Sequence, residues 1–141
     1  MAGMREPEAA SVIVHSLDQA LAAAGVAAAL DVALVLASAP GAGSYVGAGW
    51  FAALRQAVIE RYPAARLDFV LDCADEPGSV MAALRRGLRR VRFDGAAAAA
   101  AKLEAMGVEI DRSAGPALDL RGLADPEGAC RKWLAAMANA R

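Results

Sequence analysis

The residues with the clearest potential for chemistry in this chain lie where short apolar runs end. His15, Ser38, Asp72 and Asp94 each close such a run, and Cys73 follows Asp72 directly. An imidazole or a carboxylate can act as a general base, and a thiol can act as a nucleophile. We therefore take His15, Asp72, Cys73 and Asp94 as the candidate catalytic residues.

A glycine-rich stretch at 38–50, SAPGAGSYVGAGW, follows one of these runs and carries no charge. Its glycines give the pattern G-x-G-x-x-x-G, one residue longer than the dinucleotide-binding fingerprint, and it lacks the lysine of a P-loop. Backbone N–H groups at such a place can hold a phosphate or a carboxylate. Ser38, Gly41, Gly43 and Ser44 are therefore the candidate ligand-binding residues, with the glycine amides as an anion cradle.

The elements that would position these residues alternate along the chain. Apolar runs predict strands at 11–15, 32–38, 66–72 and 89–94, with shorter candidates at 108–110 and 117–120. Helical spacing predicts helices between them, and the start signals are a capping box at Ser16 and Gln19, an N-cap at Asp75 before Pro77, and Asp125 before the last helix. The first helix is expected to run to about Ala24, where Gly25 would end or weaken it, with continuation to Leu30 as the alternative.

Regular alternation of strands and helices predicts an α/β fold with a mostly parallel sheet of about five strands flanked by helices. An open, doubly wound sheet is the leading architecture. The alternative is a partial TIM-barrel-like arc of βα units, completed by a second subunit. We expect residues 1–10 to be a flexible N-terminus and 11–141 to form a single domain.

Both architectures place ligands beyond the carboxyl ends of the parallel strands. The candidate residues all follow strands, so we expect them to meet on one rim of the sheet. Serine and aspartate at strand ends also serve as helix caps, and this structural role stays open for Ser16 and Asp75.

Composition excludes several classes of protein. The net charge of -1 gives no general attraction to nucleic acid. Five arginines fall within 85–93. The alternation of Arg90 and Arg92 with Val91 and Phe93 is interpreted as an edge strand with one wet face, and an anion or nucleic-acid patch is the alternative. No histidine or cysteine pair has metal-ligand spacing, so no metal site is expected.

The remaining features indicate a protein of the cytoplasm with no membrane association. Two widely separated cysteines form no disulfide framework. The first residues lack the apolar region of a signal peptide. The uncharged run 32–54 is long enough to span a bilayer, but Pro40 and four glycines interrupt it, which favours a buried strand and a loop.

One local pattern has a known counterpart. The residues 81–87, MAALRRG, followed by 91–95, VRFDG, resemble a βα unit of phosphate-binding TIM-barrel enzymes such as the ketohydroxyglutarate-type aldolases. The resemblance implies a strand end that faces an active site. The Schiff-base lysine of those aldolases has no counterpart, because Lys102 and Lys132 both fall in predicted helices. The chain as a whole resembles small α/β proteins of alanine-rich bacterial proteomes, from which no activity carries over.

Two functions follow as hypotheses. In the first, the chain binds a small anionic or phosphorylated ligand at the rim, as a binding protein or an enzyme, with His15 or Asp72 as the base. In the second, it is a non-catalytic interaction module or a homodimer, which docks through its arginine-rich strand or through Trp133 and Met137 of the last helix. The sequence specifies no cofactor for either hypothesis.

Overall fold

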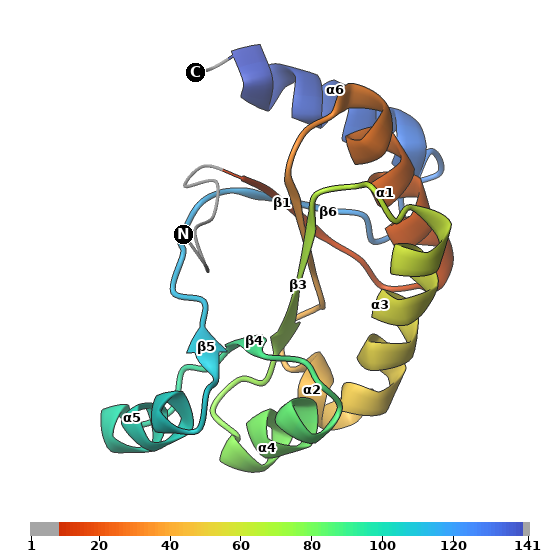
Figure 1. The fold of residues 1–141 in the computed structure, drawn as a ribbon. Helices are drawn as coiled ribbons and strands as arrows, with labels where there is room; N and C mark the ends of the chain where they lie inside the picture. Colours follow the sequence, from red (N-terminus) through yellow and green to blue (C-terminus); the bar gives the residue numbers. More distant parts are fainter. Residues whose placement is uncertain (1–8, 140–141) are drawn as a thin grey trace.

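The computed structural model describes residues 9–139, and its strands form one six-stranded, all-parallel sheet in the order β5-β4-β3-β2-β1-β6 (Figure 1). The strands are β1 (Ala10–Ile13), β2 (Leu34–Ala37), β3 (Leu67–Asp72), β4 (Arg90–Arg92), β5 (Glu109–Ile110) and β6 (Ala117–Asp119). The helices are α1 (Leu17–Leu30), α2 (Ala42–Tyr45), α3 (Ala48–Arg61), α4 (Pro77–Arg85), α5 (Ala97–Ala105) and α6 (Pro126–Asn139). The α/β class with a parallel sheet is thus confirmed, with six strands where about five were predicted.

The strands are wound in one direction. Each of the connections from β1 to β5 adds the next strand on the same side, and right-handed crossovers then place every connecting helix on the same face. The helices accordingly contact one another in the series α6, α1, α3, α4 and α5, around the convex side of a curved sheet (Figure 1). This is the winding of the barrel-like arc, not of the doubly wound sheet that was the leading architecture.

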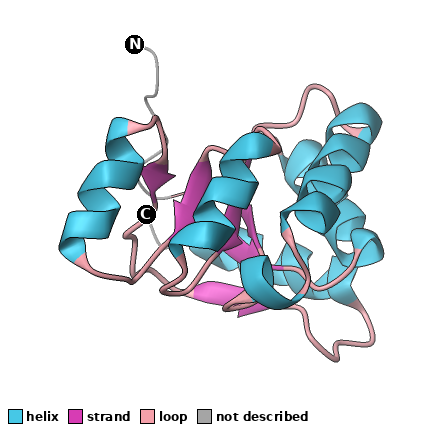
Figure 2. Cartoon of the chain, turned by 90° about the horizontal axis from the view of Figure 1, so that it is seen from below, coloured by secondary structure: helices cyan, strands magenta, loops and turns pink. Residues whose placement is uncertain are grey.

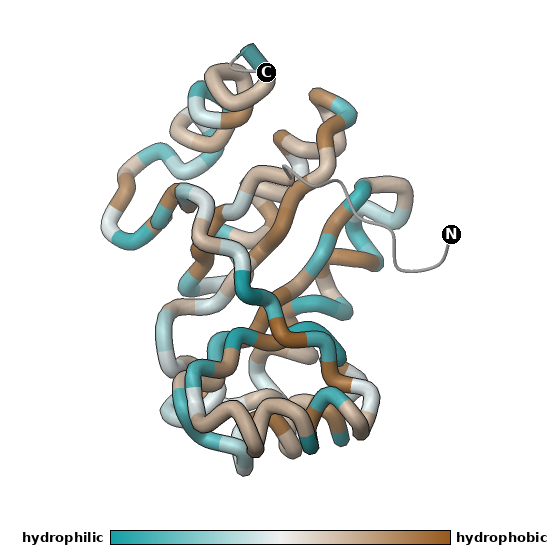
Figure 3. The backbone as a smooth tube through the Cα atoms, turned by 90° about the vertical axis from the view of Figure 1, so that its left-hand side faces the viewer, coloured by the Kyte–Doolittle hydropathy of each residue, from teal (hydrophilic) through white to brown (hydrophobic). Residues whose placement is uncertain are grey.

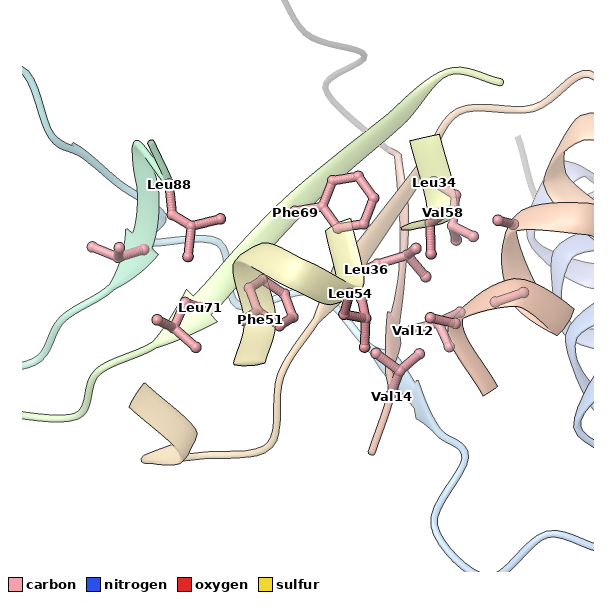
Figure 4. Packing of buried hydrophobic residues seen from close by; sticks show 14 of the residues in the cluster. Val12, Val14, Leu34, Leu36, Phe51, Leu54, Val58, Phe69, Leu71 and Leu88 are labelled. Atoms are coloured by element: carbon pink, nitrogen blue, oxygen red, sulfur yellow. The ribbon is translucent and has the colours of Figure 1, made fainter. Parts of the chain in front are cut away.

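The main core lies between this layer of helices and the sheet. Leu36 of β2 and Leu71 of β3 are fully buried against Phe51, Leu54 and Val58 of α3 (Figure 4). The most hydrophobic segments of the tube, in brown, run through the strands in the middle of the molecule (Figure 3). The buried face of α1 consists mostly of alanines, so this helix can approach the sheet closely. Figure 2 shows, from below, how close the helices lie to the strands.

Helix starts were predicted in part. Ser16 is the N-cap of α1 and accepts a hydrogen bond from the backbone of Gln19, as expected. Asp125 likewise accepts one from Gly128 N at the start of α6. The N-cap of α4 is Glu76 and not Asp75, which was predicted, because the chain turns tightly after β3 and Pro77 takes the first helical position.

The first helix takes the longer of its two expected extents and continues through Gly25 to Leu30. Gly25 lies against the ring of Tyr62, where a larger side chain would collide with the hydroxyl. One other local prediction needs correction. The strand β4 is not an edge strand, since β5 pairs with its outer side. The predicted flexible segment 1–10 falls outside the described residues except at its end, where Ala10 begins β1.

No helix within residues 9–139 has the length and apolar character needed to cross a membrane. The uncharged run 32–54 is divided between β2, a loop, α2 and part of α3.

Gly43 is expected to be irreplaceable for packing. A Cβ atom there would lie 3.1 Å from Cys73 Sγ and 3.2 Å from the carbonyl oxygen of Asp72. Substituting alanine should lower the free energy of unfolding by about 1–3 kcal/mol, as overpacking does. The control is Gly78→Ala in α4, where nothing lies within 4 Å of the added atom. That change should be neutral or stabilising by roughly 0.5 kcal/mol, because alanine favours helix. Urea denaturation measures both, and equal effects would contradict the packing argument.

Candidate rim site

The carboxyl ends of β3, β4 and β5 enclose a hollow of about 250 Å³. Asp72 and Arg92 are paired residues of adjacent strands, and they share the face of the sheet that the helices leave uncovered. The lining residues are Asp72, Ala74, Arg92, Phe93, Asp94, Asp111 and Arg112. The rim predicted from the sequence therefore contains a recess in which two arginines and three carboxylates meet.

Asp72 is held in place by the glycine-rich loop. Its Oδ1 accepts hydrogen bonds from the N–H groups of Gly41 and Ala74, each at 3.0 Å. Its own N–H donates to Ser38 Oγ at 2.9 Å, and this buried hydroxyl donates to the carbonyl of Ala39. The loop thus fixes a carboxylate at the wall of the hollow.

This arrangement changes the role expected for the glycines. The N–H groups of Gly41, Ala42 and Ser44 all donate to protein oxygens, those of Asp72, Ala39 and Gly41 respectively. Gly43 is buried against the end of β3 and allows the close approach described above. Of the four predicted ligand-binding residues, Ser38, Gly41 and Gly43 therefore support Asp72, while Ser44 is exposed.

His15 belongs to a second polar group on the same rim. Its Nε2 lies 2.6 Å from Oδ1 of Asp119, which ends the neighbouring strand β6. Its backbone N–H donates to the side chain of Gln19, whose amide donates in turn to the carbonyl of Leu120. These bonds fix the ring at the junction of β1, β6 and α1, so one nitrogen of the ring is already engaged by a carboxylate.

The carboxyl group of Asp119 is more acidic in the fold than a free aspartate, because its pKa is lowered. Burial raises its pKa, but the N–H of Arg121, the His15 ring and the charge of Arg121 together outweigh burial and lower the pKa below its usual value. An ionised partner keeps a His–Asp pair oriented. The strand β2 lies between β1 and β3, so this pair and the Asp72 hollow are separate groups on one rim.

Cys73 does not reach the rim. Its side chain is completely buried with the helix-facing core, and its Sγ points to the carbonyl of Leu71 at 3.8 Å. Burial, and after it the charge of Asp72, raises the pKa of this thiol to about 12. The structure thus gives Cys73 a packing role and offers no nucleophile at this position.

Both thiols are expected to be silent toward alkylation in the folded protein. Burial raises the pKa of Cys130 to about 11, and that side chain is also fully buried. Only the thiolate reacts, so iodoacetamide at pH 8 should label neither cysteine until denaturant is added. Mass spectrometry of the native protein measures this. Rapid labelling of Cys73 under native conditions would show that the thiol is accessible after all.

Three residues that line the hollow were not among the site residues predicted from the sequence: Arg92, Asp111 and Arg112. Arg92 donates to the carbonyl of Ser113 at 2.7 Å, while Arg112 pairs with Glu104 of α5 at 3.1 Å. Burial raises the pKa of Asp111, but hydrogen bonds from Ser113 and the charges of Arg90 and Arg92 outweigh burial and lower it. The available signal was the alternation in RVRF, which places Arg90 and Arg92 on the face opposite Val91.

Asp94 also lines the hollow, and its backbone N–H donates to the carbonyl of Ala74 at 2.8 Å. Trp133 and Met137 of α6 pack partly against the core of the chain itself. The docking face expected on this helix is therefore partly used within the molecule.

Within the described part of the chain, no three side chains of the metal-ligating types converge on one point. Comparison with known proteins adds no assignment, because no family model matches the chain and no curated protein is significantly similar to it.

Proposed function

We propose that this protein binds a small anionic or phosphorylated compound at the carboxyl-terminal rim of its sheet. The observation that carries the proposal is the hollow of about 250 Å³, in which Arg92 and Arg112 lie beside three carboxylates, those of Asp72, Asp94 and Asp111. Ligands of parallel α/β sheets bind beyond the strand ends, where this hollow lies. The resemblance of 81–95 to a phosphate-binding βα unit ends at the same strand.

The charges favour a ligand with two kinds of group. Arg92 is exposed at the hollow and can hold a phosphate or carboxylate through charge-assisted hydrogen bonds. Asp72 is fixed by two backbone donors and can accept a hydrogen bond from a ligand hydroxyl or amine. A small anion that also carries hydroxyl groups satisfies both walls. Inorganic phosphate, which keeps at least one hydroxyl at neutral pH, is the simplest anion of this kind.

If the protein is an enzyme, the same groups define the step that it can assist. Asp72 would take a proton from a ligand group held in the hollow. His15 lies with Asp119 on the other side of β2 and does not line the hollow, so this step does not involve it. The step does not require the buried thiol of Cys73 either.

A thermal-shift screen of small anionic metabolites tests this proposal. Ligands that raise the melting temperature of the wild-type protein should lose most of that shift in Asp72→Ala. His15→Ala is the control, because His15 does not line the hollow, and it should keep the shift. If Asp72→Ala keeps its fold and responds to every ligand as the wild type does, the assignment of the hollow is wrong.

A further inference from the structure

The sheet is split between β3 and β4 at the end away from the rim. The β2–β3 ladder begins at Leu67, whereas the β3–β4 ladder begins only at Leu71. The first four residues of β3 are therefore paired on one side only. Figure 1 shows β4 beside the carboxyl-terminal end of the long strand β3, which is the end at the rim.

A slot of about 200 Å³ lies at this split. Its apolar wall comes from Ile59 of α3, Leu67 and Phe69 of β3, and Leu88 just before β4, while Arg55 and Arg89 lie at its sides. An apolar cavity of ~150 Å³ is enough to hold a benzene ring. The slot therefore has room for a ligand that contains a single six-membered ring.

The split also leaves backbone groups directed at the slot. Leu34 N–H donates to the carbonyl of Arg66, and Ser38 N–H donates to that of Val70, so these residues of β3 face β2. Alternate residues of a parallel strand bond to opposite neighbours, which turns the N–H and C=O of Leu67 and Phe69 toward β4. An N–H group in a recess requires an acceptor.

The charge at the slot favours an anion. Three arginines (Arg55, Arg89 and Arg90) stand against two carboxylates (Asp68 and Glu109). Arg90 is engaged by both carboxylates, with Nη1 at 2.6 Å from Asp68 and Nε at 3.5 Å from Glu109.

The other two arginines remain to hold the ligand. Within residues 9–139, neither Arg55 nor Arg89 forms an ion pair. The guanidinium of Arg55 lies 5.9 Å from the centre of the Phe69 ring, which orients it over the apolar wall.

We infer that this slot is a second ligand site, distinct from the rim, and that it takes a small carboxylate with a compact, planar apolar body. The body packs between Leu67, Phe69 and Leu88, and the carboxylate accepts hydrogen bonds from Arg55 and Arg89. The inference does not rest on the function proposed for the rim, because the two sites lie at opposite ends of β3 and share no lining residue.

Titration of the full-length, 15N-labelled chain with benzoate, followed by NMR, tests this site. Saturable shifts should centre on the amides of Leu67, Phe69, Leu88 and Arg89. Arg55→Gln and Arg89→Gln should each weaken binding about tenfold, which is the loss of one charge-assisted hydrogen bond. The matched control Arg85→Gln, an exposed arginine of α4 outside the slot, should bind as the wild type does. Benzyl alcohol, the neutral analogue, should bind the wild-type protein no more tightly than benzoate binds the two glutamine variants of the slot.

Several results would overturn the inference. They are the absence of saturable shifts with benzoate, shifts that centre on Asp72 and Asp94 instead, or equal binding by the wild type and both glutamine variants. Arg55 and Arg89 lie at the surface of the slot, so their variants should keep the wild-type melting temperature, and that measurement separates lost binding from lost fold.

Discussion

Replacing Arg90 with alanine should lower the free energy of unfolding by about 3 kcal/mol at pH 7, near the lower end of the range for breaking a buried ion pair. Arg90 Nη1 lies 2.6 Å from Asp68, and its Nη2 lies 3.7 Å from Asp111, whose side chain is 7% exposed. The substitution leaves these carboxylates close together without their cation. The effect stays below that of a fully buried pair because Asp68 keeps some contact with water.

The pH dependence gives this prediction a second readout. The pKa of Asp111 is lowered in the folded protein, in part by Arg90, so its ionised form stabilises the fold above the pKa of the unfolded chain, near 3.9. That contribution is lost as the pH falls through the lowered, folded-state pKa. The difference between the wild type and Arg90→Ala should therefore be largest at neutral pH and shrink below about pH 4.

Urea denaturation across this pH range measures both effects. Arg85→Ala is the control, because Arg85 is exposed at the end of α4 and a surface change should cost less than about 0.5 kcal/mol. A loss for Arg90→Ala that stays constant from acid to neutral pH would show that the ion cluster does not act through its charges.

Replacing Arg92 with glutamine should weaken the binding of inorganic phosphate at the rim by roughly 10- to 100-fold. A hydrogen bond to a charged group contributes about 1.5–3 kcal/mol, and each 1.4 kcal/mol is a factor of ten in affinity. Arg92 lines the hollow, and it is the residue of β4 that pairs with Asp72 of β3, which lines the hollow too. Isothermal titration calorimetry of the two proteins gives the ratio.

The control for this change is Arg121→Gln. Arg121 stands on the same rim beside Asp119, yet it does not line the hollow. It should therefore leave phosphate binding within about twofold of wild type, apart from a small general effect of charge that salt screens. Equal losses in both variants would mean that phosphate responds to the charge of the whole rim and not to the hollow.

The sequence was sufficient to predict the layout of the fold. Short β-branched runs separated by helical spacing located the strands, and the continuous apolarity of residues 32–38 correctly predicted a strand buried on both faces. Local signals of this kind act within a few residues, so Ser16 and Asp125 were recognised as caps. The rim followed because strand ends of a parallel sheet share one edge.

What could not be predicted depends on contacts between distant residues. The bond from Gly41 N–H to Asp72 joins positions 31 residues apart, and the pair of His15 with Asp119 joins positions 104 apart. Strand order is equally non-local, which is why the one-sided winding was only the alternative. Arg90 was interpreted as a wet edge residue because the sequence predicted a short strand at 108–110 but did not show that this strand, β5, pairs with β4.

The most direct test of the rim proposal is an NMR titration of the 15N-labelled chain with inorganic phosphate. The geometry predicts saturable shifts at millimolar phosphate that centre on the amides of Ala74, Phe93, Asp94 and Arg112, around the hollow. These shifts should be lost in Arg92→Gln and kept in Arg121→Gln. Shifts that never saturate, or that spread evenly over the arginines of the whole surface, would contradict an anion site at the rim.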